Sequence, residues 1–348
     1  MIKASMYPSA EQSGFPNFSL AELHTHIAPS ISPSVYWQIA HDQGYKLPKK
    51  DYYEFVDYLM LSEQKKMTLD EYLHNIYHPL LDKLSSGTFA LEKAMYEVIS
   101  GAYRNNISLI EIRGNIMKHN SNGEQDLDHI IMAMLHGMER ALLEYPKLSA
   151  GFIFCLAREY SMEQNQIIVD KAIKYHRRGV VAIDFAGPAT ETFHLKDYAD
   201  LIKKAKNAGL NVTTHSGEVT EAHDMWEAIE FIEPKRIGHG IKAAYDKALM
   251  KELAKREIVL EVCPMSNMMT KAVENKEEMK FILRTFIENN VKFTINTDWP
   301  EVIEGAHLWR QFKMLRDENI MTEEELIKCN ETAFASTFIP GKGLDAYL

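Results

Sequence analysis

The sequence predicts an α/β fold, specifically a closed (β/α)8 TIM barrel with a helical insert after its first strand. Eight short runs typical of buried β-strands occur along the 348 residues, and helical patterns separate most of them. Nearly apolar strands that alternate with helices pair in parallel through right-handed crossovers and are buried on both faces. Eight such strands favour a closed barrel, and an open doubly wound sheet is the alternative.

The expected strands are spread from one end of the chain to the other, at residues 18–27, 107–116, 148–158, 180–187, 211–218, 235–240, 257–264 and 291–298. Amphipathic patterns with apolar residues three and four apart predict helices at 123–145, 162–178, 194–209 and 277–290. No linker, low-complexity tract or repeat interrupts residues 15–335, so we expect residues 1–348 to form a single domain.

The first connection is much longer than a single crossover helix requires, because about 80 residues separate the first two strands. This length predicts extra helices at about 33–86. Long connections are often functional, so the aromatic residues of the insert either line the mouth of a pocket or pack the insert onto the barrel. These residues are Tyr36, Trp37, Tyr52, Tyr53, Phe55, Tyr58, Tyr72 and Tyr77.

The composition disfavours nucleic acid and membranes as partners. There are 39 basic and 49 acidic residues, which gives a net charge of −10 and no basic footprint for a polyanion. No run approaches the roughly 20 apolar residues of a membrane span, and the N-terminal segment lacks the apolar stretch of a signal peptide. Cys155, Cys263 and Cys329 are too few for a disulfide framework. We therefore expect a soluble cytoplasmic protein that binds a small molecule.

Polar residues gather at the C-terminal ends of the expected strands, which is the face where barrel enzymes build their active sites. They follow four different strands and meet at one rim. The segments are His24-Thr25-His26, His215-Ser216-Gly217-Glu218, Gly238-His239-Gly240 and Asn296-Thr297-Asp298.

Three histidines and one aspartate at this rim are candidate metal ligands. His24 and His26 are two apart on a strand, so their side chains point to the same face. Together with His215 and Asp298 they form a nitrogen and oxygen donor set that suits one Zn²⁺ per chain, with Fe²⁺, Co²⁺ and Mn²⁺ as alternatives. Otherwise each is an ordinary hydrogen-bonded residue.

Glu218 and His239 are candidate catalytic residues. A metal with an open position lowers the pKa of a bound water, and a nearby acid or base then moves the proton. Glu218 lies just past the strand end, while glycines on both sides of His239 let a backbone come close. Alternatively, Glu218 is an acid at a helix N-terminus and the two glycines form a tight turn.

Other catalytic signatures are missing from the sequence. It contains no GxSxG, no GxxxxGK[ST] and no GxGxxG motif. The H-x-E and P-C-x-x-C signature of cytidine-type zinc deaminases is also absent. We therefore expect Cys263 to be a buried strand residue rather than a ligand.

In combination these motifs resemble the adenosine deaminase family of the amidohydrolase superfamily, from about residue 18 to about residue 340. Besides the four rim segments, the resemblance rests on Met67-Thr68-Leu69, Glu111-Ile112-Arg113, Leu156-Ala157-Arg158, Asp184-Phe185-Ala186-Gly187, Arg236-Ile237 and Glu261-Val262-Cys263-Pro264-Met265-Ser266-Asn267.

The resemblance implies a role for each candidate. His24, His26, His215 and Asp298 would bind Zn²⁺. Glu218 would protonate a ring nitrogen as hydroxide attacks, His239 would assist the hydroxide, and the backbone of Gly187 would meet the purine.

Two positions depart from the family pattern. The family usually has an aspartate for a sugar hydroxyl where this chain has Ala28, and a second aspartate for the purine N7 edge where it has Trp299. We therefore expect a metal-dependent hydrolytic deaminase of purine metabolism whose substrate is adenosine-like or another amino-heterocycle, with Ala28 and Trp299 at altered substrate positions. The alternatives are hydrolysis of another cyclic C–N bond, or a metal-binding barrel without catalysis.

Overall fold

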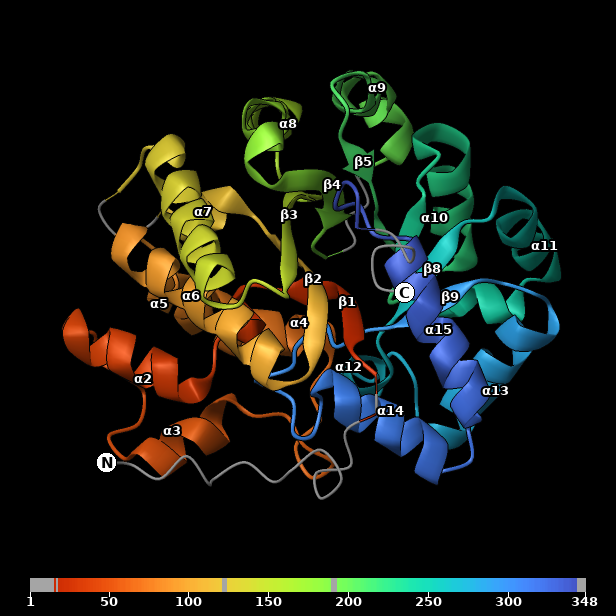
Figure 1. The fold of residues 1–348 in the computed structure, drawn as a ribbon, viewed down its shortest axis with the longest axis horizontal. Helices are drawn as coiled ribbons and strands as arrows, with labels where there is room; N and C mark the ends of the chain where they lie inside the picture. The colour runs from red at the N-terminus through yellow and green to blue at the C-terminus, as the bar shows by residue number, and fades with distance from the viewer. Residues whose placement is uncertain (1–15, 17, 121–123, 189–192, 343–348) are drawn as a thin grey trace.

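The computed structural model describes residues 16, 18–120, 124–188 and 193–342, and its parallel strands form a barrel surrounded by helices (Figure 1). One sheet has the order β1-β2-β3-β4-β5 and the other the order β6-β7-β8-β9, with every pairing parallel. The strands are β1 (Leu20–His26), β2 (Ile107–Gly114), β3 (Ser149–Ala157), β4 (Val180–Ala186), β5 (Asn211–Val212), β6 (His215–Ser216), β7 (Arg236–His239), β8 (Val259–Val262) and β9 (Phe293–Ile295).

Backbone hydrogen bonds join the two sheets at both seams. The His26 amide donates to the Asp298 carbonyl over 3.1 Å, and the Asp298 amide donates to the His24 carbonyl over 2.8 Å. At the other seam, the Thr213 amide donates to Ile183 of β4, and the Thr214 carbonyl accepts from Gly238 of β7. The predicted barrel is confirmed. The strand predicted at 211–218 is divided into β5 and β6, because Thr213 and Thr214 each bond to a different neighbouring strand.

The insert predicted at about 33–86 consists of short helices. They are α2 (Pro33–Asp42), α3 (Tyr52–Leu59), α4 (Leu69–Tyr72), the π-helix η2 (Leu73–Leu81) and α5 (Asp82–Leu84). The fully buried Tyr36, Phe55 and Tyr72 pack the insert onto the barrel, whereas Tyr77 lines a cavity. Both expected uses of the insert aromatics therefore occur, in different residues.

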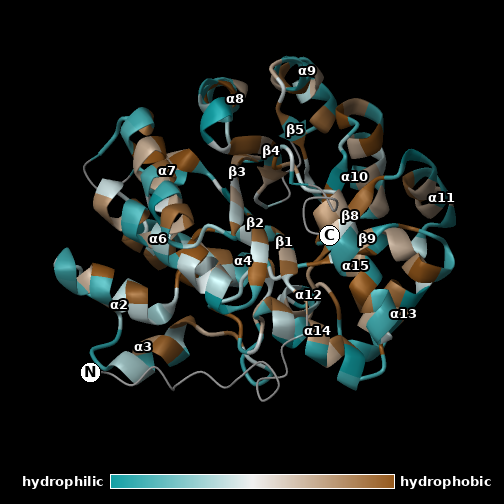
Figure 2. Ribbon diagram, viewed as in Figure 1, coloured by the Kyte–Doolittle hydropathy of each residue, from teal (hydrophilic) through white to brown (hydrophobic). Residues whose placement is uncertain are grey.

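Longer helices form the outer ring, and each carries apolar and polar residues, as Figure 2 shows. They are α6 (Thr88–Arg104), α7 (Leu127–Glu144), α8 (Met162–Tyr175), α9 (Ala199–Asn207), α10 (Ala222–Glu227), α11 (Lys247–Arg256), α13 (Lys276–Glu288), α14 (Leu308–Asp317) and α15 (Glu323–Ala335). Shorter pieces connect them: η1 (Ala28–Ser30), η3 (Ile116–His119), η4 (His176–Arg178), η5 (Leu195–Tyr198), η6 (Ala228–Ile232), η7 (Ile241–Tyr245) and α12 (Pro264–Met269).

The four helices predicted from amphipathic patterns correspond to α7, α8 with η4, η5 with α9, and α13. Within the described residues, no helix is both long and apolar enough to cross a membrane. The N-terminal segment, in which the sequence predicts no signal peptide, lies almost wholly outside the described residues. The single-domain organisation and the cytoplasmic location stay predictions.

Candidate metal centre

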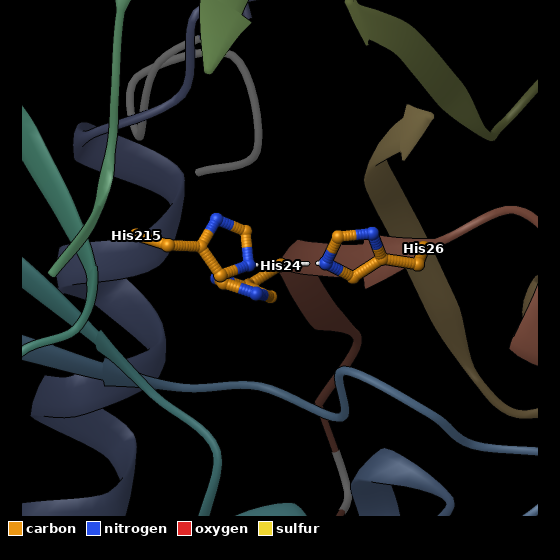
Figure 3. A group of neighbouring side chains, drawn as sticks. All are labelled: His24, His26 and His215. Atoms are coloured by element: carbon orange, nitrogen blue, oxygen red, sulfur yellow. Dashed lines mark hydrogen bonds between the residues drawn. The ribbon is translucent and has the colours of Figure 1, made fainter. Parts of the chain in front are cut away.

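The side chains of His24, His26 and His215 point toward one another at the C-terminal end of the barrel (Figure 3). One ring nitrogen from each lies within 4.8 Å of the other two. The Nε2 atoms of His26 and His215 are 3.1 Å apart, close enough for both to reach a single ion. β1 supplies His24 and His26, and β6 supplies His215.

Asp298 completes the predicted donor set. Its Oδ1 lies 3.6 Å from His24 Nε2 and 3.5 Å from His26 Nε2, while its Oδ2 accepts a hydrogen bond of 2.6 Å from Ser266. Asp298 also has a positive φ of 61°, which is strained for a residue with a side chain. Backbone hydrogen bonds to β1 hold Asp298 in this conformation, in which its carboxylate faces the histidines.

Buried carboxylates lie beside Nδ1 of two of the three imidazoles. His24 Nδ1 lies 2.8 Å from Glu261 Oε2, and His215 Nδ1 lies 2.9 Å from Asp184 Oδ2. Arg113 bridges the pair, since its guanidinium donates to Asp184 over 2.9 Å and to Glu261 over 2.7 Å. A carboxylate on Nδ1 leaves Nε2 free for a metal and fixes the ring, as is usual at zinc centres.

The protonation states suit metal binding. Burial lowers the pKa of His24 and of His26 well below the ordinary value, so both imidazoles are neutral. Although burial acts to raise the pKa of Asp184, His215 and Arg113 outweigh it and hold that pKa well below its usual range. The centre thus combines the neutral imidazoles of His24 and His26 with the ionised carboxylate of Asp184.

The donor set fits a divalent metal. His24 Nε2 is buried and makes no hydrogen bond to any of the described residues, and an unsatisfied buried polar atom costs about 1–3 kcal/mol. A metal ion would remove this penalty, and three imidazoles with one carboxylate are ligands that zinc prefers. Cys263 is also near His24, but burial raises the pKa of its thiol well above the usual value, which disfavours the thiolate needed for coordination.

Glu218 and His239 form a second buried pair beside the centre. His239 Nε2 lies 3.5 Å from Glu218 Oε2, and Asn267 Nδ2 lies 3.0 Å from His239 Nδ1. Since an amide nitrogen donates, His239 Nδ1 accepts and Nε2 carries the proton toward Glu218. Burial, with Asp298 adding to it, raises the pKa of Glu218 to about 8, so its carboxyl is mostly protonated at neutral pH.

A cavity of about 920 Å³, including its open mouth, joins these groups to the surface. Its lining includes His26, His215, Glu218, His239, Asp298, Gly187 and Trp299. Trp299 is 3% exposed, and its ring centroid lies 4.8 Å from that of Tyr72 and 6.0 Å from that of Tyr77. The tryptophan thus forms part of the cavity wall and is supported by insert aromatics.

Ala28 has a different position from the one expected for a substrate-binding residue. It is fully buried in η1, outside the cavity lining, and its carbonyl accepts a 2.7 Å hydrogen bond from the Tyr36 hydroxyl. The turn after β1 carries it into the contact between insert and barrel. Ala28 therefore does not line the cavity. It affects substrate binding only because it lacks the carboxylate that the family usually has at this position.

Glu261, Asp184 and Asn267 are site residues whose roles the sequence analysis missed, although all three occur in its motifs. The available signal was a charged residue inside an otherwise apolar strand, as Glu261 is in β8 and Asp184 in β4. The sequence did not reveal their partners, because His24 and Glu261 are 237 residues apart along the chain.

Replacement of Gly238 by a residue with a side chain should disturb the metal centre. A Cβ built there would lie 2.9 Å from His24 Cε1, too close for a ring that Glu261 already holds. We expect Gly238→Ala to displace the His24 ring and to lower the metal content of the purified protein. Gly101→Ala is the matched control, because its Cβ would meet only Arg104 at 3.8 Å. Equal metal content in the two variants would contradict the close contact.

A sequence model of one family, described as adenosine deaminase, matches residues 19–346. An adenosine deaminase of Clostridium botulinum (strain 657 / Type Ba4) is 31% identical over 294 residues, which are 84% of this chain and 86% of the relative.

Two solved structures share the fold. The adenine deaminase of Arthrobacter aurescens has a TM-score of 0.82 at 21% identity, covering 95% of this chain and 97% of its own. An amidohydrolase of Burkholderia ambifaria with bound Zn has a TM-score of 0.83 at 17% identity, covering 99% of this chain and 93% of its own.

Proposed function

The chain belongs to the adenosine deaminase family, and from that premise we propose that it is a metal-dependent hydrolytic deaminase of an adenosine-like amino-heterocycle. This family membership confirms the resemblance to adenosine deaminases that the sequence motifs indicate. The reaction replaces an amino group on a ring carbon by oxygen from water and releases ammonia. One divalent ion per chain, zinc by preference, is the cofactor.

One observation carries this proposal: the candidate ligands and a buried acid share one cavity. His26, His215 and Asp298 line the cavity together with Glu218 and His239, and His24 lies directly behind them. A protein that only binds a metal has no need of a buried glutamate whose pKa is raised toward neutrality. The pairing of metal ligands with a proton donor supports hydrolysis over simple metal binding.

Different residues of the chain contribute to different steps of the reaction. Bound to His24, His26, His215 and Asp298, Zn²⁺ would supply Lewis acidity that makes water a nucleophile at neutral pH. Glu218 gives its proton to the ring nitrogen next to the amino-bearing carbon, so that carbon accepts the oxygen of water.

His239 and Gly187 act on the two sides of that step. His239, with its Nε2 proton directed by Asn267, holds the incoming oxygen and stabilises the charge that develops. The backbone of Gly187, at φ 101° on the cavity wall, meets the heterocycle. Of the two protons of the attacking water, one restores the Glu218 carboxyl and the other goes to the amino group; the C–N bond to that group then breaks and it leaves as ammonia.

The substitutions at two positions predict a preference against plain adenosine. A carboxylate hydrogen bond is worth roughly 1.5–3 kcal/mol, and this chain lacks two that the family usually makes, because Ala28 and Trp299 stand in their places. We expect adenosine to have a kcat/KM lower by at least about 10² than the best substrate.

The assay is ammonia release from a panel of adenosine, 2′-deoxyadenosine, adenine and their N6-modified or 5′-modified analogues. Adenosine turnover near about 10⁶ M⁻¹s⁻¹, which is ordinary for an enzyme's own substrate, would refute the argument from Ala28 and Trp299. Turnover of cyclic amides or esters without ammonia from any aminated ring would overturn the proposed reaction.

A further inference from the structure

The chain that follows α15 packs against the N-terminal end of the barrel, opposite the metal centre. Residues 336–339 run from that helix toward β4 (Figure 1). Phe338 is 5% exposed and packs against side chains of β3 and β4. A Cβ on Gly151, near the beginning of β3, would lie 3.0 Å from Ile339 Cγ1. The segment therefore fits closely into the barrel rather than resting on its surface.

This segment also binds a buried carboxylate and a buried guanidinium. The Thr337 hydroxyl and the Phe338 amide both donate to Glu111 Oε1, over 2.6 Å and 2.5 Å. The Ser336 carbonyl accepts a 2.8 Å hydrogen bond from Arg236 Nη1, and Arg236 Cζ lies 3.6 Å from the centroid of the Phe338 ring. Glu111 and Arg236 are fully buried. Because buried charges must be paired and hydrogen-bonded, the segment supplies partners that both side chains need.

Arg236 connects the segment to the carboxylate beside His24. Its Nη2 donates to Glu111 over 2.5 Å, and its Nε donates to Glu261 Oε1 over 2.6 Å. The other oxygen of Glu261, Oε2, lies 2.8 Å from His24 Nδ1. All four side chains are fully buried, and hydrogen bonds are stronger in such a low-dielectric interior. A chain of contacts thus runs from the segment after α15 to a candidate metal ligand.

The orientation of the Glu261 carboxylate depends on contacts to both of its oxygens. Arg113 and His24 contact Oε2, whereas Arg236 and the Thr213 hydroxyl donate to Oε1. Arg236 supplies the charged contact on Oε1. Without the guanidinium on that side, the carboxylate could rotate and turn Oε2 away from the His24 ring.

We propose that Thr337, Glu111 and Arg236 are positioning residues for a metal ligand. They act through Glu261, from the opposite end of the barrel, and hold the His24 ring toward the ion. The inference rests on the metal centre of the proposed function and extends it to residues that touch neither the metal nor the substrate. The segment after α15 thereby raises the affinity of the centre for its ion.

Arg236→Lys tests the middle of this chain of contacts. Lysine keeps the charge but lacks the planar guanidinium that donates to Glu111, to Glu261 and to a backbone carbonyl at once. We expect the Kd for Zn²⁺, measured by competition with a chromophoric chelator, to rise by about tenfold, as the loss of an outer contact of a metal ligand predicts. Arg284→Lys is the matched control, because Arg284 pairs through two hydrogen bonds with Glu325 between α13 and α15. It should leave the Kd unchanged.

Thr337→Val tests the end of the chain of contacts, because it removes one hydroxyl with little change of shape. We expect it to raise the Kd for Zn²⁺ by about threefold, which is part of the roughly fivefold effect of one hydrogen bond. Thr337→Ser keeps the hydroxyl that donates to Glu111 and should restore the affinity. Thr332→Val is the matched control, because the Thr332 hydroxyl bonds to the Lys328 carbonyl within α15.

The double variant, with Arg236→Lys and Thr337→Val together, tests whether the two residues act along one path. If Thr337 acts through Arg236, the double variant should bind Zn²⁺ no more weakly than Arg236→Lys alone. Multiplication of the two effects would overturn the inference, because the residues would then act separately.

Unchanged zinc affinity in Arg236→Lys or in Thr337→Val would also overturn the inference. A purely structural role predicts this result, with the Tm of the metal-free and the zinc-bound protein lowered by the same amount. If circular dichroism shows that Arg236→Lys does not fold, the comparison of Thr337→Val with Thr337→Ser decides.

Failure of the proposed function has a different result. An unsubstituted protein that binds no zinc would refute the metal centre and the inference with it. Zinc binding without ammonia release from any aminated heterocycle would refute the proposed reaction alone, since the zinc affinities of the variants do not depend on turnover.

Discussion

Replacement of both His24 and His26 by alanine is expected to reduce the metal content from about one divalent ion per chain to nearly none. The double variant removes two of the four candidate ligands, and the remaining His215 and Asp298 cannot enclose an ion in tetrahedral geometry. Metal analysis of the purified protein after gel filtration measures the effect. Circular dichroism shows whether the barrel is still folded.

His136→Ala is the control for this prediction, because His136 is exposed on α7, away from the cavity lining. It should keep the full metal content. Full occupancy in the double variant would exclude His24 and His26 as ligands and would leave the group of Glu218, His239 and Asp298 as the alternative centre.

Glu218→Gln is expected to keep its metal and to lose turnover by about 10² to 10⁴, which is the usual contribution of general acid catalysis. The amide preserves size and polarity but cannot deliver a proton to the ring. Ammonia release and metal analysis on the same sample measure both properties. Glu221→Gln is the matched control, because Glu221 is an exposed carboxylate three residues away. Loss of metal from Glu218→Gln would instead make Glu218 a ligand.

The pH dependence provides a second readout of Glu218. Burial raises its pKa to about 8, and the proposed role needs the protonated form. Activity that depends on this proton is present below that pH and falls as the pH rises through it. Glu218→Gln does not titrate, so its residual activity should lack this alkaline decline.

The sequence predicted the barrel from eight apolar strands that alternate with helices, and it predicted the candidate ligands from their positions at the ends of those strands. His24 and His26 share a face because they are two apart, and parallel strands bring His215 and Asp298 to the same rim. Such patterns are local in the sequence. The division of the strand at 211–218 was not predictable, because it depends on which neighbouring strand bonds to Thr213 and Thr214.

Contacts between distant segments explain what the sequence analysis did not predict. Glu261 was visible as an acid in an apolar strand, but its place behind His24 depends on Arg113, which bonds to it from a different strand. The family resemblance implies a substrate position for Ala28, where the family usually has an aspartate. The turn of η1 buries it against Tyr36 instead, which depends on how the insert folds back.

Deamination is expected to require the metal held by the three histidines and Asp298. The most direct measurement adds zinc in steps to metal-free protein and follows ammonia release from the best substrate of the panel. We expect the rate to rise with added zinc and to saturate at about one ion per chain. Ammonia release that is equal before and after zinc is added, with the protein shown to be metal-free, would contradict it.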